Sequence, residues 1–175
     1  MRRANDISQD GSYIPSPQAG RHADERFGTH HARDAWHVFD TLGYDLDLFS
    51  SAIKLNTQYM HAIWFQLKVK DPVTLDSLKN HINENPRVAV NYKKSANSVF
   101  SFGRDHGHYG RILSQTVLPV RSLVVNQGRE IMGFCYTPQD GNALLSSVAA
   151  TMHFLFPEEV DRRLRCLRPF MFQEV

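Results

Sequence analysis

The chain has 175 residues, of which 42% are hydrophobic and 22% are charged. This composition supports one globular core and excludes both a disordered segment and a small scaffold that depends on disulfides. Twenty Lys and Arg residues against 18 Asp and Glu leave a formal charge of +2. Nucleic acid is therefore a disfavoured partner, because phosphate neutralisation supplies most non-specific affinity.

The cellular compartment is suggested by what the sequence lacks. Cys135 and Cys166 are too few for a disulfide framework, and no basic segment followed by an apolar segment opens the chain. The apolar stretches fall short of the ~20 residues that span a bilayer. We therefore expect a soluble cytoplasmic protein that does not bind membranes.

Composition divides the chain into three expected regions. Residues 1–35 are rich in Ser, Gly, Pro, Arg, Asp and His, and they predict an extended surface loop. Residues 36–156 contain the periodic apolar patterns of a folded domain, and residues 157–175 are expected to form a C-terminal tail. Within the domain, residues 52–55 predict a short first strand.

The strongest local patterns lie in the first half of the domain. Residues 62–70 alternate from Phe65 onward, which predicts a half-buried strand. Asp71-Pro72 ends it, and Thr74 is placed as the N-cap of a helix with apolar positions at helical spacing. Asn85-Pro86 ends that helix, and residues 87–92 predict the next strand.

The second half of the domain continues in the same mixed manner. A short helix is expected from Ser95 to Asp105, and residues 117–125 and 129–136 predict a hairpin around Asn126-Gln127-Gly128. Residues 142–156 predict an amphipathic helix that Pro157 ends. The sequence therefore predicts an α+β fold, with a mixed or antiparallel sheet and about three helices packed on one face.

Signatures for nucleotides and metals are absent from the sequence. The ten glycines never form Gly-x-Gly-x-x-Gly or a phosphate-binding loop, and the cluster at 103–110 neither follows a strand nor opens a helix. Asp105, His106 and His108 could bind zinc, but no further ligand stands at a recognisable spacing. A solvent-facing loop is favoured there, and we predict no metal site.

Three histidines are candidates for chemistry, each with a structural alternative. His30 and His31, between Thr29 and Arg33, could surround an anionic substrate, although the sequence alone favours a solvated polar loop there. His61 stands just before a strand, where an imidazole can accept a proton from a thiol or hydroxyl, or can serve as a hydrogen-bonded structural residue.

Neither cysteine is a convincing nucleophile. Cys135 lies in an apolar strand, where burial is expected and a thiol behaves as a small hydrophobe. Cys166 stands beside Arg165, which would lower its pKa somewhat. The residues taken alone therefore lead no further than an α+β domain.

The order of short segments along the chain carries more information than any one of them. These segments are Met1-Arg-Arg-Ala-Asn-Asp6, Thr29-His-His31, Ala52-Ile-Lys54 with Asn56-Thr57, Met60-His61, Gln66-Leu-Lys68, Asp71-Pro-Val-Thr74, Asn85-Pro-Arg-Val-Ala-Val90 and Gly103-Arg-Asp105. Together they resemble type II glyceraldehyde-3-phosphate dehydrogenase, the archaeal-type form. The similarity extends to about Ala150 and corresponds to the C-terminal catalytic half, beginning just after the segment with the nucleophilic cysteine.

The resemblance implies an activity. Enzymes of this family use a cysteine thiolate and NAD or NADP to oxidise D-glyceraldehyde 3-phosphate, and phosphate then releases 1,3-bisphosphoglycerate. A histidine accepts the thiol proton, because a thiol is only slightly ionised at neutral pH. The resemblance also implies the α+β fold of the catalytic domain and a homotetrameric assembly.

The resemblance assigns roles to residues of this chain. It implies His61 as the catalytic base, Thr29, His30, His31 and Arg104 as contacts of the triose phosphate, and Arg2 and Arg3 as residues near the cofactor. Two positions depart from the family pattern: Tyr59 stands where a second histidine is usual, and the Gln-Glu-Ser stretch that meets the cofactor falls near Thr137-Pro-Gln139.

The nucleophile and the nucleotide-binding half lie outside the similarity. The isolated chain is therefore expected to be inactive, with NAD or NADP bound mainly by the missing half. Expected partners are that half or sister subunits, and the alternative is a non-catalytic oligomerisation or regulatory domain. The catalytic reading predicts that His30, His31 and His61 converge on one cleft, and that apolar patches of interface size are exposed.

Overall fold

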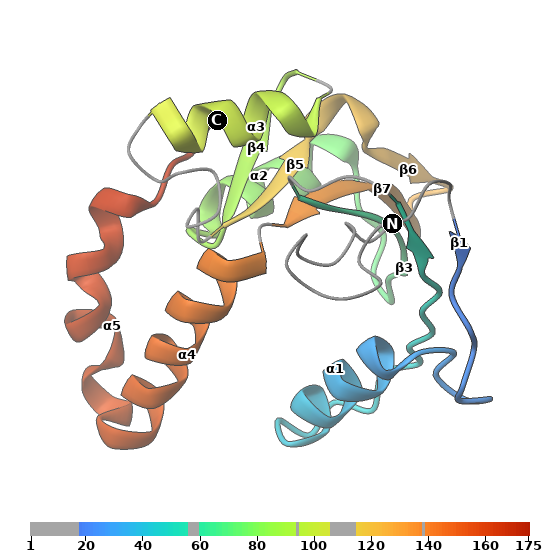
Figure 1. Cartoon of the computed structure of the whole chain (residues 1–175), viewed down its shortest axis with the longest axis horizontal. Coiled ribbons are helices and arrows are strands. Elements are labelled where there is room, and N and C mark those ends of the chain that lie inside the picture. The colour runs from blue at the N-terminus through green and yellow to red at the C-terminus, as the bar shows by residue number, and fades with distance from the viewer. Residues whose placement is uncertain (1–17, 56–59, 94, 106–114, 138) are drawn as a thin grey trace. The chain divides into compact units, whose positions relative to one another are not determined.

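The chain forms two compact units in the computed structural model, residues 1–58 and residues 59–175 (Figure 1). The structure describes residues 18–55, 60–93, 95–105, 115–137 and 139–175. Sequence composition placed a boundary after residue 35, whereas the two units meet between residues 58 and 59. No helix among the described residues is long and apolar enough to cross a membrane.

Residues 18–55 of unit 1 form a two-stranded ribbon and one helix. Strands β1 (Gln18–Ala19) and β2 (Ile53–Lys54) pair antiparallel, and helix α1 (His30–Asp40) lies between them in the sequence. The short strand expected at 52–55 is thus confirmed. The expectation of an extended loop through residue 35 is wrong for its last six residues, because α1 begins at His30.

Unit 2 is built on a mixed sheet. Its strands are β3 (His61–Lys68), β4 (Val88–Asn91), β5 (Thr116–Pro119), β6 (Val124–Asn126) and β7 (Glu130–Thr137). The order across the sheet is β3-β7-β5-β4, and β6 also pairs with β7. Strands β4 and β5 are parallel and the other pairs are antiparallel, which confirms the expected α+β class with a mixed sheet.

Local signals in the sequence place the helices of unit 2. They are α2 (Leu75–Glu84), α3 (Ala96–Asp105), α4 (Gln139–Leu155) and α5 (Val160–Arg163). Thr74 caps α2 as predicted: its hydroxyl accepts from the Ser77 amide at 3.1 Å, and the Ser77 hydroxyl accepts from the Thr74 amide at 3.0 Å. This reciprocal capping satisfies two amide donors that a helix start leaves unpaired.

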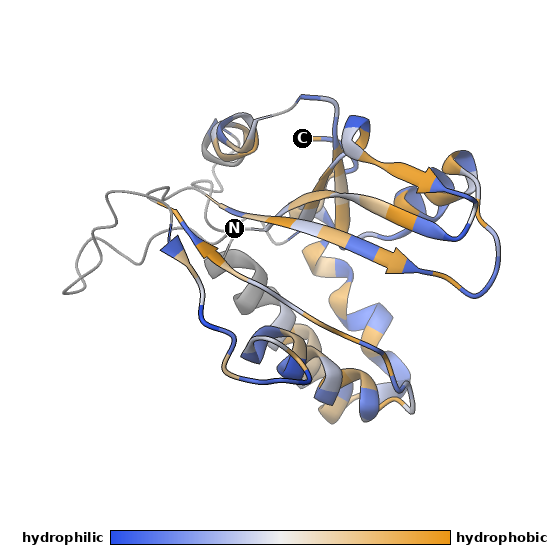
Figure 2. Cartoon of the chain, turned by 90° about the vertical axis from the view of Figure 1, so that its right-hand side faces the viewer, coloured by the Kyte–Doolittle hydropathy of each residue, from blue (hydrophilic) through white to orange (hydrophobic). Residues whose placement is uncertain are grey.

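Helices cover both faces of the sheet. On one face, Leu78 and Ile82 of α2 pack on Leu118 and Cys135. On the other face, Val99 of α3 packs on the strand residues that alternate with these, as period-two side chains require. Hydrophobic residues accordingly concentrate along the strands (Figure 2). The arrangement differs from the expected packing of helices on one face only.

The predicted hairpin forms only where β6 pairs with β7. Strand β6 turns into β7 through Gln127 and Gly128, which have φ values of 50° and 69°. Positive φ at both positions suits the right-handed twist of paired strands, and glycine adopts it without steric cost. A short 3-10 helix, η1 (Val120–Ser122), separates β5 from β6, so that the expected first strand is divided.

The C-terminal region contains short helices, and its last residues bond to the sheet. It forms the 3-10 helices η2 (Pro157–Glu159) and η3 (Leu164–Phe170) around α5. The Val90 amide donates to the Gln173 carbonyl at 2.8 Å, and the Val175 amide donates to the Val90 carbonyl at 3.0 Å. The last residues therefore bond to the edge of β4, and Val175 enters the core on the α3 face.

One buried side chain fastens this C-terminal segment. The Gln115 side chain is fully buried, and its Nε2 donates to the carbonyls of Pro86 at 3.0 Å and Phe172 at 2.7 Å. Its Oε1 accepts from the Phe172 amide at 2.7 Å. Both amide hydrogens and the oxygen are thus used, as a buried polar group requires.

Replacing this amide should destabilise unit 2. We expect Gln115→Leu to lower the free energy of unfolding by about 2–4 kcal/mol, because it removes three hydrogen bonds that the buried side chain makes to main-chain groups of Pro86 and Phe172. Urea unfolding followed by circular dichroism measures the change. Gln173→Leu is the matched control, because that side chain is exposed. Equal stability of the two variants would contradict the role assigned to Gln115.

Candidate functional site

The first candidate site lies at the N-terminus of α1 in unit 1. Gly28 precedes the helix with φ 74°, and its amide donates to the Asp24 carbonyl at 2.8 Å. A Cβ built on Gly28 would lie 2.3 Å from the Ser50 carbonyl oxygen. Only glycine fits this approach, which brings Ser50 beside the start of the helix.

Ser50 supplies the cap of α1 from outside the helix. Its hydroxyl lies 2.6 Å from the Thr29 hydroxyl and accepts from the Ala32 amide at 3.1 Å. Thr29 holds the N-cap position but makes no side-chain cap of its own, and it is 7% exposed. Its hydroxyl therefore orients the helix start, which fits a positioning role better than direct substrate contact.

His30 and His31 are the first two residues of α1, and both are exposed. Their ring centroids are 4.0 Å apart, with the rings tilted by 46°. The N-terminus of a helix carries a partial positive charge and amides without intrahelical partners, so anions are stabilised there. Two imidazoles at this end can add hydrogen bonds to a phosphate or carboxylate.

Composition did not single out His22, which lies in the same unit. Its Nε2 is 2.8 Å from the Ser51 hydroxyl, and its ring meets Phe49 edge-on with centroids 5.5 Å apart. Residues 21–25 and Phe49 line an open pocket of about 420 Å³. The sequence carries no periodicity that links His22 to Phe49, because the contact joins two loops.

The second candidate site is the start of β3 in unit 2. His61 is the first residue of this strand, lies opposite Thr137 of β7, and is half-buried. Met60, the preceding residue, is 3% exposed in the core on the α3 face. This anchor and the cross-strand neighbour restrict the backbone that carries the imidazole.

Cys135 shares the sheet face of His61 but is not open to solvent. It lies opposite Ile63, two pairs further along the ladder than the His61–Thr137 pair. The side chain is 8% exposed, and burial raises the pKa of its thiol to about 11, against a smaller lowering effect of a hydrogen bond with Thr137. The predicted burial is confirmed, and a thiol protonated at neutral pH makes a poor nucleophile.

The predicted site residues belong to different parts of the chain. His30 and His31 belong to unit 1 and His61 to unit 2, so the convergence of the three imidazoles stays a prediction. Arg104 belongs to the last turn of α3. Arg2, Arg3, His106 and His108 lie outside the described residues. Within the described ranges, no group of three or more His, Cys, Asp or Glu residues could hold a metal ion.

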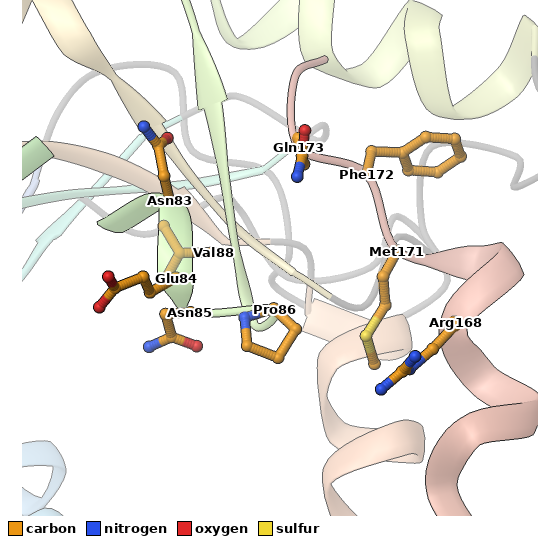
Figure 3. Close-up of a pocket in the computed structure, with 9 residues that line it drawn as sticks. All are labelled: Asn83, Glu84, Asn85, Pro86, Val88, Arg168, Met171, Phe172 and Gln173. Atoms are coloured by element: carbon orange, nitrogen blue, oxygen red, sulfur yellow. The ribbon is translucent and has the colours of Figure 1, made fainter. Parts of the chain in front are cut away.

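A pocket that the sequence did not indicate opens beside the C-terminal segment (Figure 3). It encloses about 410 Å³, within the range of small-molecule sites. One wall is the end of α2 with the start of β4, and the other wall runs from Arg168 to Gln173. The bonds of Gln115 to Pro86 and Phe172 hold these two walls together, and none of the predicted site residues that the structure describes lines the pocket.

Comparison with known proteins does not assign the chain to a family. No protein-family model matches the chain, and no curated protein matches it significantly.

The two thiols should differ in reactivity. We expect iodoacetamide at pH 8 to label Cys166, which is exposed, and to spare Cys135 in the native chain, because only an accessible thiolate reacts. Peptide mass spectrometry identifies the labelled residue. Unfolding in urea is the control and should expose both thiols. Native labelling of Cys135 would instead make it a candidate nucleophile.

Ionisation of Cys135 should also weaken the fold at high pH. Its folded-state pKa of about 11 exceeds the ordinary value of 9.0, so stability from the protonated thiol is present below pH 9 and is lost as pH rises toward 11. We expect the free energy of unfolding of the native chain to fall by about 1–2 kcal/mol relative to Cys135→Ala across this interval. Urea titrations at several pH values measure the difference, and a constant difference would contradict the assignment.

Proposed function

We propose that the chain supplies the catalytic half of an NAD(P)-dependent, phosphorylating glyceraldehyde-3-phosphate dehydrogenase of type II. The observation that carries this proposal is the series of short segments that occur in the same order as in that family. One of these segments, Met60-His61, lies at the start of β3. The α+β class with a mixed sheet is compatible with such a domain. The anchored, half-buried position of His61 supports its assignment as the base.

His61 would act on the thiol of the nucleophilic cysteine. Imidazole is the side chain best suited to accept a proton at neutral pH, and the thiolate so formed adds to the aldehyde carbon of D-glyceraldehyde 3-phosphate. Met60 in the core and Thr137 across the ladder would keep the ring in place during this transfer. That carbon would then lose a hydride to NAD or NADP, which leaves an acyl thioester, and phosphate would displace the thiolate from this acyl group to give 1,3-bisphosphoglycerate.

The triose phosphate would contact the N-terminus of α1. His30 and His31 are exposed at the positive end of this helix, and the Thr29–Ser50 hydrogen bond orients the backbone that carries them. Arg104 is proposed as a further anion contact, because a guanidinium binds phosphate in a bidentate manner. These roles derive from the family resemblance and from the chemistry of the residues.

The nucleophile and the cofactor site would come from a partner half. NAD or NADP supplies the hydride acceptor when it is bound. This sequence contains no Gly-x-Gly-x-x-Gly, and the described residues offer no dinucleotide fold, so Arg2 and Arg3 would add contacts to a nucleotide held mainly elsewhere. The buried thiol of Cys135 also supports a nucleophile outside these 175 residues.

Reconstitution with a nucleotide-binding half tests the proposal. We expect no turnover from this chain alone, and NAD(P) reduction that depends on both D-glyceraldehyde 3-phosphate and phosphate when it is co-expressed with a half that carries the nucleophilic cysteine. His61→Ala should lower this turnover by about 10²–10⁴-fold, the usual contribution of a general base.

The control and the contrary outcomes are distinct. His81→Ala alters an exposed histidine of α2 that pairs with Glu84, and it should leave the rate unchanged. An unchanged rate in His61→Ala would remove His61 from the role of base. A stable complex of the two halves without turnover would favour the alternative of a non-catalytic oligomerisation or regulatory domain.

A further inference from the structure

The pocket between Pro86 and Arg168 takes no part in the proposed dehydrogenase reaction. Both of its walls belong to unit 2: one is the junction of α2 with β4, and the other is residues 168–173. Its volume of about 410 Å³ lies near the lower end of the range for small-molecule sites, which is about 300–1,000 Å³. The space therefore suits a small free molecule rather than a segment of another protein.

Hydrogen bonds fix both walls of this pocket within the chain itself. The side chain of Gln115 joins one wall to the other. The Met171 amide donates to the Arg168 carbonyl at 3.1 Å, so the chain turns there and the two side chains share one wall. On the opposite wall, the Arg87 amide donates to Asn85 Oδ1 at 2.9 Å. A ligand would therefore enter a site that is already ordered, which lowers the entropy cost of binding.

Arg168 supplies the positive charge of the pocket. Among the described residues it forms no ion pair, whereas Arg162 and Arg163 both bond to Glu159. Figure 3 shows its guanidinium directed toward the side of the pocket where Pro86 lies. A guanidinium presents parallel N–H donors that match the two oxygens of a carboxylate. This cation is therefore available to an acid that enters the pocket.

Apolar side chains stand beside this cation. Val88 and Met171 are half-buried, and together with Pro86 they line the pocket. A thioether is flexible and makes favourable contacts with aromatic rings. The ring of Phe172 packs edge-on against Phe102, with centroids 5.0 Å apart, and in Figure 3 it points away from Pro86. The lining thus offers one charged contact and an apolar surface next to it.

The wall opposite Arg168 is unfavourable for anions. Residues 83–85 form the C-terminal end of α2, where a helix carries a partial negative charge. Glu84 adds a carboxylate to this wall, and its Oε2 lies 3.8 Å from Nδ1 of His81. A second acidic group on a ligand would meet these negative charges. The pocket therefore favours ligands with a single carboxylate.

We propose that this pocket binds a small monocarboxylic acid, with the carboxylate on Arg168 and an apolar body against Pro86, Val88 and Met171. The ligand joins the C-terminal segment to the α2–β4 junction, so that its binding stabilises unit 2. No residue that carries this inference is a proposed contact of the triose phosphate or the cofactor. The inference therefore does not depend on the proposed dehydrogenase activity.

Phenylacetate is a suitable probe, because it combines one carboxylate with one aromatic ring. We expect isothermal titration calorimetry of the full chain to show saturable binding, and the unfolding midpoint to rise with phenylacetate concentration. Phenylacetamide has the same body without the charge, and 1,4-phenylenediacetate has a second carboxylate. Each should bind at least about tenfold more weakly than phenylacetate, since a hydrogen-bonded charge is lost or an unfavourable one is added.

Substitutions locate the binding site. Arg168→Gln should raise the dissociation constant of phenylacetate by at least about tenfold. Arg165→Gln is the matched control, because this exposed arginine of η3 does not line the pocket, and it should leave the constant unchanged. Glu84→Gln should narrow the difference between phenylacetate and 1,4-phenylenediacetate. Circular dichroism and the protection of Cys135 from alkylation report the fold of each variant.

Three outcomes would overturn the inference. The first is the absence of saturable binding up to about 10 mM phenylacetate, well above the concentrations at which specific small ligands bind. The second is equal affinity for phenylacetate and phenylacetamide, which would exclude recognition of the carboxylate. The third is unchanged binding in a folded Arg168→Gln variant, which would place the ligand elsewhere.

Discussion

The buried amide of Gln115 is the interaction on which the architecture of unit 2 depends. It joins the start of β4 to the C-terminal segment through Pro86 and Phe172, and it leaves none of its own hydrogen-bonding groups unused. Because Phe172 is held there, the following residues reach the edge of β4 and Val175 enters the core. The same clamp forms the two walls of the pocket beside Arg168. The hydrogen bonds of Gln115 therefore hold the edge of β4, the core residue Val175 and the two walls of the pocket in place.

The mixed sheet also separates the chemical roles of its side chains. Alternation along β7 directs Cys135 into the core on the α2 face, where burial keeps the thiol protonated. His61 lies on that same face at the end of the ladder, where it is only half-buried and opposite Thr137. Proton transfer by His61 is therefore compatible with the geometry, whereas nucleophilic attack by Cys135 is not. The proposed reaction therefore does not use Cys135 as its nucleophile.

Local signals predicted most of the secondary structure, and contacts between distant residues account for the differences. Thr74 caps α2 through a residue three positions away, and the alternation around Phe65 belongs to one strand, so both follow from short stretches of sequence. The start of α1 at His30 depends on Ser50, twenty residues further along the chain. Of the candidate site, the exposure of His30 and His31 and the burial of Cys135 are structural facts, while their meeting with His61 stays a prediction. The pockets beside Phe49 and Arg168 were not predictable, because each joins segments without a shared pattern.

The sequence by itself determined the α+β class, the capped helix after Thr74, the long strand around Phe65 and the burial of Cys135. Periodicity and capping act over a few residues, and they are therefore readable before folding. Only the tertiary structure decided that helices cover both faces of the sheet, that residues 173–175 pair with the edge of β4, and that β3 lies at the opposite edge. These features depend on which strands become neighbours, and strand order follows from hydrogen bonds and packing between residues that are far apart in the sequence.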